Sequence, residues 1–324
     1  MVSKKRDLSV TGQMKHAWPS GGPCPCESGR DFVSCCRRPD GSAYKPPALL
    51  LSRGLETGDQ TPGCYLSESY DCRGDLSDEH YVSKSVLSAV VGPVAAVSGV
   101  PWLDTGETQE IPIGRLAARV LCERHNGALS PLDAEMGRFM RALSLIYANL
   151  GETKSLSRKG LRFLFSGVDI ERWFAKAALG LFHSGIAARE REKLKSSGSI
   201  HPLVSAALNG RPFHRPCGLY VLSRAQNSIG NPGVLALAPL SSDQTDRMVG
   251  LRLMFMGVDA AMLLDPQATY GAELLELRSY RPSYMYFRHH SRKHLIALSW
   301  PDSNPHNGIL FDLAGRVRKQ APTP

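Results

Sequence analysis

The sequence predicts an α+β protein in which two small cysteine-rich modules precede several helices and a mainly antiparallel sheet. Seven of the eight cysteines lie before residue 123. Behind them, two segments have apolar residues at helical spacing, and short apolar runs between turn residues begin at residue 218. The chain has 324 residues, enough to bury a sizeable core without disulfides.

Composition excludes several classes of protein. Hydrophobic residues make up 42% of the chain and charged residues 21%, which is typical of a globular protein and excludes a wholly disordered one. No apolar run reaches the roughly 20 residues needed to span a bilayer, and no apolar segment follows the basic N-terminus. We therefore expect a soluble, cytoplasmic protein with no membrane partner, whose cysteines are reduced and available as metal ligands.

The charge of the chain is unevenly distributed. Residues 61–150 carry 7 basic and 11 acidic side chains, net −4, whereas residues 151–324 carry 23 basic and 13 acidic ones, net +10. A basic surface attracts phosphates and an acidic segment supplies carboxylates for cations, which would suit a metal-dependent nuclease. Scattered solvated Lys and Arg side chains would give the same sums, and charge alone leaves both interpretations open.

The first cysteine group has the spacing C-x-C-x8-C-C, which allows four sulfurs to surround one tetrahedral Zn²⁺. Its members are Cys24, Cys26, Cys35 and Cys36. With the intervening Ser28-Gly29 turn and Phe32, the segment resembles the SEC-C motif, although Glu27 stands where that family usually has Gly. The resemblance implies a zinc-binding module over residues 1–40 that is structural or contacts a protein partner. Residues 41–63 are rich in Gly and Pro and are expected to be a linker.

The second group is dispersed but offers four soft ligands, enough for a second closed zinc site. Its members are Cys64, Cys72, Cys122 and His125. Such a site would crosslink two strands and a helix around a very small core, because zinc binding contributes folding free energy directly.

The order Glu79-His80, Leu121-Cys122-x-x-His125-Asn126 resembles the HNH (ββα-metal) endonucleases over about residues 64–140, and the resemblance implies an HNH-like zinc-stabilised domain at residues 64–150. That resemblance implies that Glu79 and His80 end a strand and that Asn126 opens the helix. It also implies a general base at His80 and one Mg²⁺ or Mn²⁺ held by Glu79 and Asn126, for hydrolysis of DNA phosphodiesters. The Asn that orients the catalytic His in this family has no counterpart, since no Asn occurs between residues 81 and 121. Another group, such as a backbone carbonyl, would have to orient His80.

The remaining elements belong to an α+β region of unknown role at residues 151–324. Ser130-Pro131 predicts the start of a helix over 131–149, and Asp169 predicts the cap of a second helix that ends at Gly185. The charged residues 189–193 are expected to continue that helix. Seven strands are predicted: 218–223, 233–239, 249–256, 261–265, 284–289, 294–300 and 308–313.

Two questions of function stay open at this level. Tyr284 and Tyr286 precede Arg288 and Lys293, a pattern that would hold single-stranded nucleic acid or would simply be a solvated strand end. For the whole chain, the leading hypothesis is an HNH-type endonuclease acting on DNA. The alternative is a non-catalytic, zinc-containing module that binds nucleic acid or protein and retains a degenerate HNH site.

Overall fold

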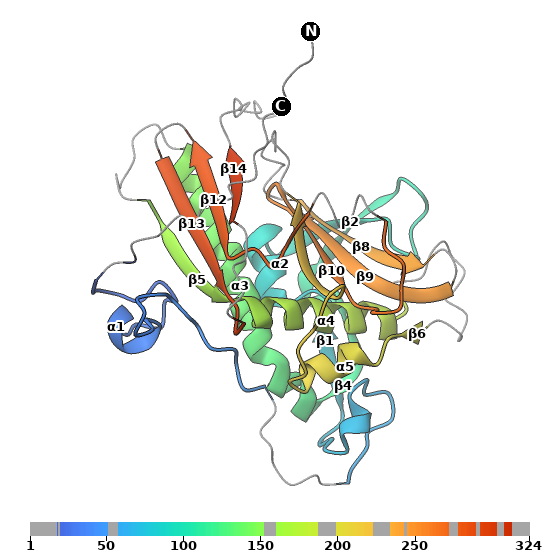
Figure 1. Ribbon diagram of the computed structural model, residues 1–324. Coiled ribbons are helices and arrows are strands. Elements are labelled where there is room, and N and C mark those ends of the chain that lie inside the picture. Colours follow the sequence, from blue (N-terminus) through green and yellow to red (C-terminus); the bar gives the residue numbers. More distant parts are fainter. Residues whose placement is uncertain are drawn as a thin grey trace.

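The computed structural model describes residues 18, 20–50, 58–151, 160–186, 199–222, 234–242, 245–271, 278–289, 292–302 and 308–312. Within these residues, five α-helices and several mostly antiparallel sheets form a mixed α+β fold, as the sequence predicts (Figure 1). No helix of the described part is long and apolar enough to cross a membrane. The predicted continuation over residues 189–193 lies outside the described residues.

Residues 58–151 are built around one strand pair and one long helix. Strand β1 (Leu76–His80) pairs antiparallel with β4 (Ala117–Cys122), and helix α3 (Glu123–Gly151) follows β4 directly. The chain between β1 and β4 holds α2 (Lys84–Val90) and a hairpin of β2 (Val94–Ser98) and β3 (Thr108–Pro112). The two strands and the helix therefore have the order β-β-α, with a helix and a hairpin inserted between the strands.

Helix α3 begins earlier than the sequence predicts. The predicted start at Ser130-Pro131 is wrong, because the helix already begins at Glu123 and includes Pro131 in its interior. The first turn is held by two backbone hydrogen bonds, from the amides of Glu123 and Arg124 to the carbonyls of Asp75 and Arg73. These tertiary contacts outweigh the local capping signal at Ser130-Pro131. The face that repeats Met136, Met140 and Leu143 is fully buried, in agreement with the predicted amphipathic pattern.

Helix α4 (Gly167–His183) follows strand β5 (Arg162–Ser166), which the sequence analysis missed. Its N-cap is Ser166, whose side chain accepts from the Asp169 amide, so the predicted cap at Asp169 is displaced by three residues. Gly185 lies just past the end of the helix with φ +76°, a conformation that glycine adopts without strain. Almost the whole helix is buried.

Two larger sheets flank α3 and α4 (Figure 1). One has the order β14-β12-β13-β5, with β12 (Tyr284–His289) antiparallel to β13 (Arg292–Ser299) and parallel to β14 (Gly308–Asp312). The other sheet contains β7 (Gly218–Leu222), β8 (Leu235–Ser242), β9 (Thr245–Phe255) and β10 (Val258–Leu263), with the short strands β6 (Ser199–Ile200) and β11 (Arg278–Tyr280) at its edges. All seven predicted strands are present, with ends shifted by a few residues. The short α5 (Leu203–Leu208) packs against α4.

One continuous hydrophobic cluster includes residues from both sides of position 150. Met136 and Leu143 of α3 belong to it together with Phe165, Leu253 and Ile296 from the two sheets. A second, small cluster holds the N-terminal cysteines against the β5–β13 side of the first sheet.

Two candidate metal centres and a buried ion-pair cluster

The N-terminal cysteines form a knuckle, which we define as residues 20–40. The Sγ atoms of Cys24, Cys26, Cys35 and Cys36 all lie within 4.8 Å of one another. Glu27 and Gly29 both have positive φ and reverse the chain between the two cysteine pairs. Helix α1 (Phe32–Cys35) then presents the second pair, capped by the Asp31 carboxylate. Phe32 is fully buried beneath the knuckle, which gives it a small apolar base.

The knuckle is bound to the first sheet. The amide of Leu164 in β5 donates to the Pro25 carbonyl at 3.0 Å, so the knuckle is hydrogen-bonded to the edge strand of the sheet. Leu164 and Ala297 pack against the cysteines. On α3, Arg138 donates to the Leu164 carbonyl at 2.7 Å and forms an ion pair with Glu27 at 3.3 Å.

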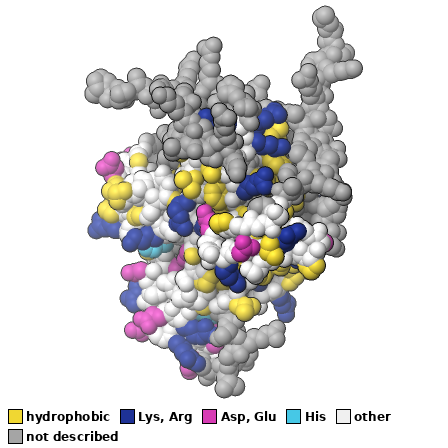
Figure 2. Space-filling model, turned by 90° about the vertical axis from the view of Figure 1, so that its left-hand side faces the viewer, with side chains coloured by type: hydrophobic (Ala, Val, Ile, Leu, Met, Phe, Trp, Pro, Cys, Tyr) yellow, Lys and Arg dark blue, Asp and Glu magenta, His cyan; other side chains and the backbone are white. Residues whose placement is uncertain are grey.

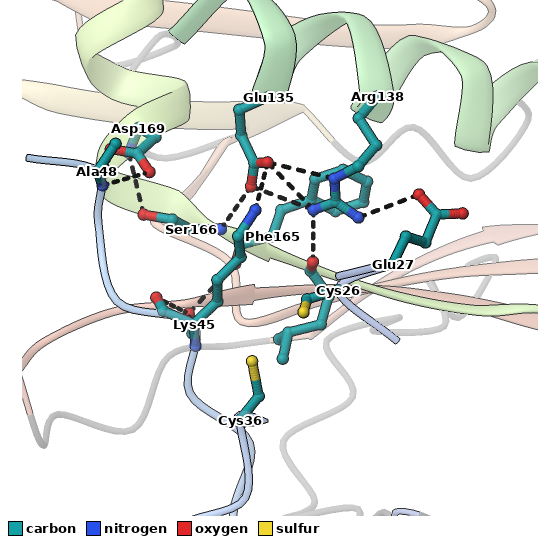
Figure 3. A network of polar contacts seen from close by, with 12 residues as sticks. Cys26, Glu27, Cys36, Lys45, Ala48, Glu135, Arg138, Phe165, Ser166 and Asp169 are labelled. Carbon is teal, nitrogen blue, oxygen red and sulfur yellow. Dashed lines mark hydrogen bonds and ion pairs between the residues drawn. The ribbon is translucent and has the colours of Figure 1, made fainter. Parts of the chain in front are cut away.

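A polar network joins the knuckle and the following residues to the core (Figure 3). Glu135 of α3 pairs with Arg138 at 3.2 Å and also with Lys45. Burial alone would raise the pKa of Glu135, but Arg138 and Lys45 outweigh it and hold the pKa below its usual value. Farther along, the Ala48 amide donates to the carboxylate of Asp169 at 3.0 Å. Residues 45–48 of the predicted linker are therefore bonded to the core.

The second candidate centre lies where β4 meets α3. The ligand atoms of Cys64, Cys72, Cys122 and His125 lie within 4.8 Å of one another, and all four residues are buried. Nδ1 of His125 is 3.1 Å from the sulfur of Cys122, 3.3 Å from that of Cys64 and 3.7 Å from that of Cys72. The dispersed ligands of the predicted second site thus meet at one point.

The far side of the His125 ring is held by Asp71. Nε2 of His125 lies 2.8 Å from Asp71 Oδ1 and 3.0 Å from Ser69 Oγ, and Arg124 pairs with the other carboxylate oxygen of Asp71. Burial would raise the pKa of Asp71, but bonds from Ser69 and His125 and the charge of Arg124 lower it. An ionised Asp71 accepts a hydrogen bond from Nε2–H of His125, which leaves Nδ1 unprotonated with its lone pair directed toward the three sulfurs.

Both donor sets are closed. Four thiolates, or three thiolates and one imidazole, satisfy the four positions of a tetrahedral metal and leave no position for water or substrate. Such centres stabilise a fold and do no chemistry themselves. Any catalysis would have to come from other residues, and the predicted ones are Glu79, His80 and Asn126.

Glu79 is engaged in a buried ion-pair cluster. Its carboxylate is 4% exposed and lies 2.5 Å from Nζ of Lys176, an ammonium on α4 that also contacts Asp133 of α3 at 2.5 Å. Ser83 donates to Asp133 and accepts from the indole of Trp173 at 2.6 Å. Burial raises the pKa of Glu79 to about 7, against the opposing effect of Lys176. Lys176 is thus the immediate cation for two carboxylates.

His80 ends β1, as the HNH resemblance implies. Burial and the nearby Lys84 lower its pKa, whereas a hydrogen bond to the backbone of Ile113 has the opposite effect. The buried Nε2 atom has no hydrogen-bond partner among the described residues.

Asn126 lies in the first turn of α3, and its contacts lead elsewhere. Its amide nitrogen donates to Ser77 Oγ at 2.9 Å and reaches the Asp78 carbonyl at 3.4 Å. Asp133, which approaches Glu79 through Lys176, is seven residues farther along the helix, about 10 Å away at 1.5 Å per residue. Neighbouring residues of a strand also point to opposite faces, which separates Glu79 from His80. Glu79, His80 and Asn126 therefore contact three separate sets of residues.

Sequence reasoning missed the residues that surround these sites. Lys176 interrupts the apolar run of α4, and a lone Lys in an otherwise buried helix usually marks a buried carboxylate partner. Asp71 directly precedes the ligand Cys72, a weak signal for a carboxylate beside a metal-binding His. Asp133 and Glu135 carried no signal beyond their place on a predicted helix.

The fold and the two centres define a mixed α+β protein with two closed candidate metal sites. Comparisons of this chain with protein-family models, with curated proteins and with solved structures found no match.

Proposed function

We propose that this chain is a zinc-stabilised, non-catalytic nucleic-acid-binding protein whose ββα unit is related in form to HNH endonucleases but closed to catalysis. Zinc is the metal best suited to both donor sets, because thiolate-rich tetrahedral sites favour it over Mg²⁺ or Ca²⁺. The knuckle at residues 20–40 would then be a SEC-C-like module that serves the fold.

The observation that carries this proposal is the burial of Glu79 against Lys176. A nuclease must present its metal-binding carboxylate to a water molecule and to the phosphate of the substrate. Glu79 and Lys176 are 4% and 3% exposed, and the ammonium is already paired with both Glu79 and Asp133. A Mg²⁺ ion at Glu79 would have to displace Lys176 and would still be inaccessible to a polynucleotide.

The charge of the chain supports nucleic acid as the partner. The formal net charge is +9, concentrated after residue 150, and such a field attracts polyanions without any sequence readout. Binding of this kind needs no open metal position.

One observation favours the second candidate, an active endonuclease. His80 stands at the end of β1 and its ring lies beside the backbone of Ile113, the kind of group that orients a general base. For this function, Asn126 and a carboxylate other than Glu79 would have to supply the cation site.

The test combines cleavage and binding by the full chain. Plasmid and single-stranded DNA are incubated with the zinc-loaded protein and Mg²⁺ or Mn²⁺, alongside His80→Ala and, as a matched control, His214→Ala on an exposed loop. We expect salt-sensitive binding by all three proteins and no cleavage by any. Elemental analysis should find two zinc ions per chain.

Cleavage by the native chain and by His214→Ala, but not by His80→Ala, would establish the enzyme instead. Absence of DNA binding at low salt would reject nucleic acid as the partner. One zinc ion or none would remove at least one of the two centres.

A further inference from the structure

The hairpin of β2 and β3 forms a separate two-stranded sheet. Among the described residues its strands pair only with each other, and Val94 lies opposite Pro112 at the base of the hairpin. The face that carries Ala95 and Ile111 packs against the hydrophobic core, whereas the residues of the opposite face are exposed. In Figure 1 the hairpin and its loop lie on the side of the molecule away from the knuckle.

This hairpin exposes apolar side chains beside an acidic loop. Trp102 of the loop is 48% exposed, and Val94 at the base is 44% exposed. Residues 85–114 contain three acidic side chains and no Lys or Arg, in a chain of net charge +9. Figure 2 shows the side of the molecule that carries the knuckle, where Lys and Arg side chains are spread over the surface. The hairpin would therefore repel a phosphate backbone, and its exposed apolar residues suit a protein partner.

A hollow lies at the base of the same hairpin. It has a volume of about 490 Å³ and is lined by Lys84, Ser88, Gly92, Pro93, Ile113 and Gly114. A Cβ atom added at Gly92 or Gly114 would meet no atom within 4 Å, so the space beside both glycines is open. The buried Ile113 gives the hollow an apolar wall, and the exposed Lys84 adds a positive charge to it. Lys84 has no ion-pair partner within the described residues.

The hairpin is complementary to itself when two copies lie antiparallel. Each strand has five residues, so the loop lies about 17 Å from the base at about 3.3 Å per residue. In this arrangement the loop of each copy reaches the base of the other, where Trp102 meets the hollow and Glu107 meets Lys84. Arg115, exposed beside the hollow, adds a second cation at that base. A two-fold axis repeats both contacts, as in most symmetric dimers.

We infer that two copies of this chain associate through their β2–β3 hairpins, with Trp102 of each copy in the hollow of the other. Trp is enriched among the residues that dominate interface energies, because it buries a large apolar area in a well-packed pocket. Residues 93–115 match the roughly 20 to 30 residues that each partner contributes to a stable interface. The inference goes beyond the proposed function and does not depend on it, since this association needs no nucleic acid.

The test is the mass of the zinc-loaded full chain in solution, measured by sedimentation equilibrium without nucleic acid. Trp102→Ala removes the inserted side chain, and Gly114→Leu fills the hollow. Leu145→Ala is the matched control, because Leu145 is an apolar residue of α3 with a similar exposed fraction, 53%. Unchanged thermal unfolding of these variants shows that the fold is intact.

We expect the native chain and Leu145→Ala to have twice the mass of one chain. Trp102→Ala and Gly114→Leu should each weaken dimerisation by about 30-fold or more, which is equivalent to about 2 kcal/mol and typical of a central interface residue. A monomeric native chain would overturn the second copy as the partner of the hairpin. A dimer that neither variant weakens would overturn the assigned interface.

The charge contact has a test of its own. Lys84→Glu and Glu107→Lys should each weaken the dimer, because each places like charges opposite one another. An equimolar mixture of the two variants should recover dimers, since a mixed pair contains one native contact and one reversed contact. A mixture no more dimeric than either variant alone would overturn the antiparallel arrangement.

Discussion

Replacing Asp71 with Asn should weaken zinc binding at the second centre without abolishing it. Asp71 Oδ1 lies 2.8 Å from Nε2 of His125 and holds the ring so that Nδ1 faces the three sulfurs. Asn keeps the shape of the side chain but loses the negative charge, and hydrogen bonds to a neutral acceptor are roughly half as strong. Loss of such a partner of a metal-bound His typically costs about 10- to 100-fold in affinity. We expect a loss in this range, or about 1.4 to 2.8 kcal/mol.

The assay is competition for zinc between the protein and a chromophoric chelator, read at equilibrium. Asp75→Asn is the matched control, because Asp75 is an exposed residue nearby. Its substitution removes the same charge without changing a partner of His125. Both variants should still bind two zinc ions at saturation, and Co²⁺ substitution should show an altered visible spectrum only for Asp71→Asn. An affinity of Asp71→Asn within twofold of the native value, or an equal loss in Asp75→Asn, would refute this role of Asp71.

Three further predictions concern stability and metal content. Lys176→Met should lower the free energy of unfolding in urea by about 3–5 kcal/mol, because it leaves Glu79 buried beside Asp133 without a cation, and adding Glu79→Gln should restore part of the loss. Glu135 has a pKa below its ordinary 4.5, so its ionised form stabilises the fold above that pH, and the benefit is lost as the pH falls through the folded pKa. The urea midpoints of the native chain and Glu135→Gln should therefore differ at pH 6 and converge as the pH falls through the folded pKa. Cys35→Ser should leave one zinc ion per chain by elemental analysis and make residues 20–50 sensitive to limited proteolysis, whereas loss of both ions would contradict independent binding sites.

The metal centres were predictable because their ligands are of few types and their spacing is restrictive. The knuckle cysteines lie within 13 residues, so a local turn is enough to bring them together. Cys64 and His125 are 61 residues apart, yet a short list of candidate ligands left few ways to complete a four-ligand set. Both groups are confirmed as clusters that could hold a metal.

The environment of Glu79 could not be predicted in the same way. The motif fixes its position beside His80 at the end of a strand but carries no information on which helix packs against that strand. Lys176 reaches Glu79 from α4, 97 residues away in the chain, as a result of tertiary packing alone. The predicted start of α3 was wrong for a related reason. Backbone contacts from residues 73–75 hold the first turn of the helix, so the helix does not begin at the Ser130-Pro131 cap.

Helix α3 links the two metal centres mechanically. His125 in its first turn belongs to one centre, and Glu135 and Arg138 bind the knuckle that holds the other. These positions are about 15 to 20 Å apart along one rigid rod. Each metal centre therefore anchors one part of helix α3, and the two centres are supported by the same helix. Loss of one metal would still leave the helix anchored at the other centre, so a molecule that has lost one ion would keep the second.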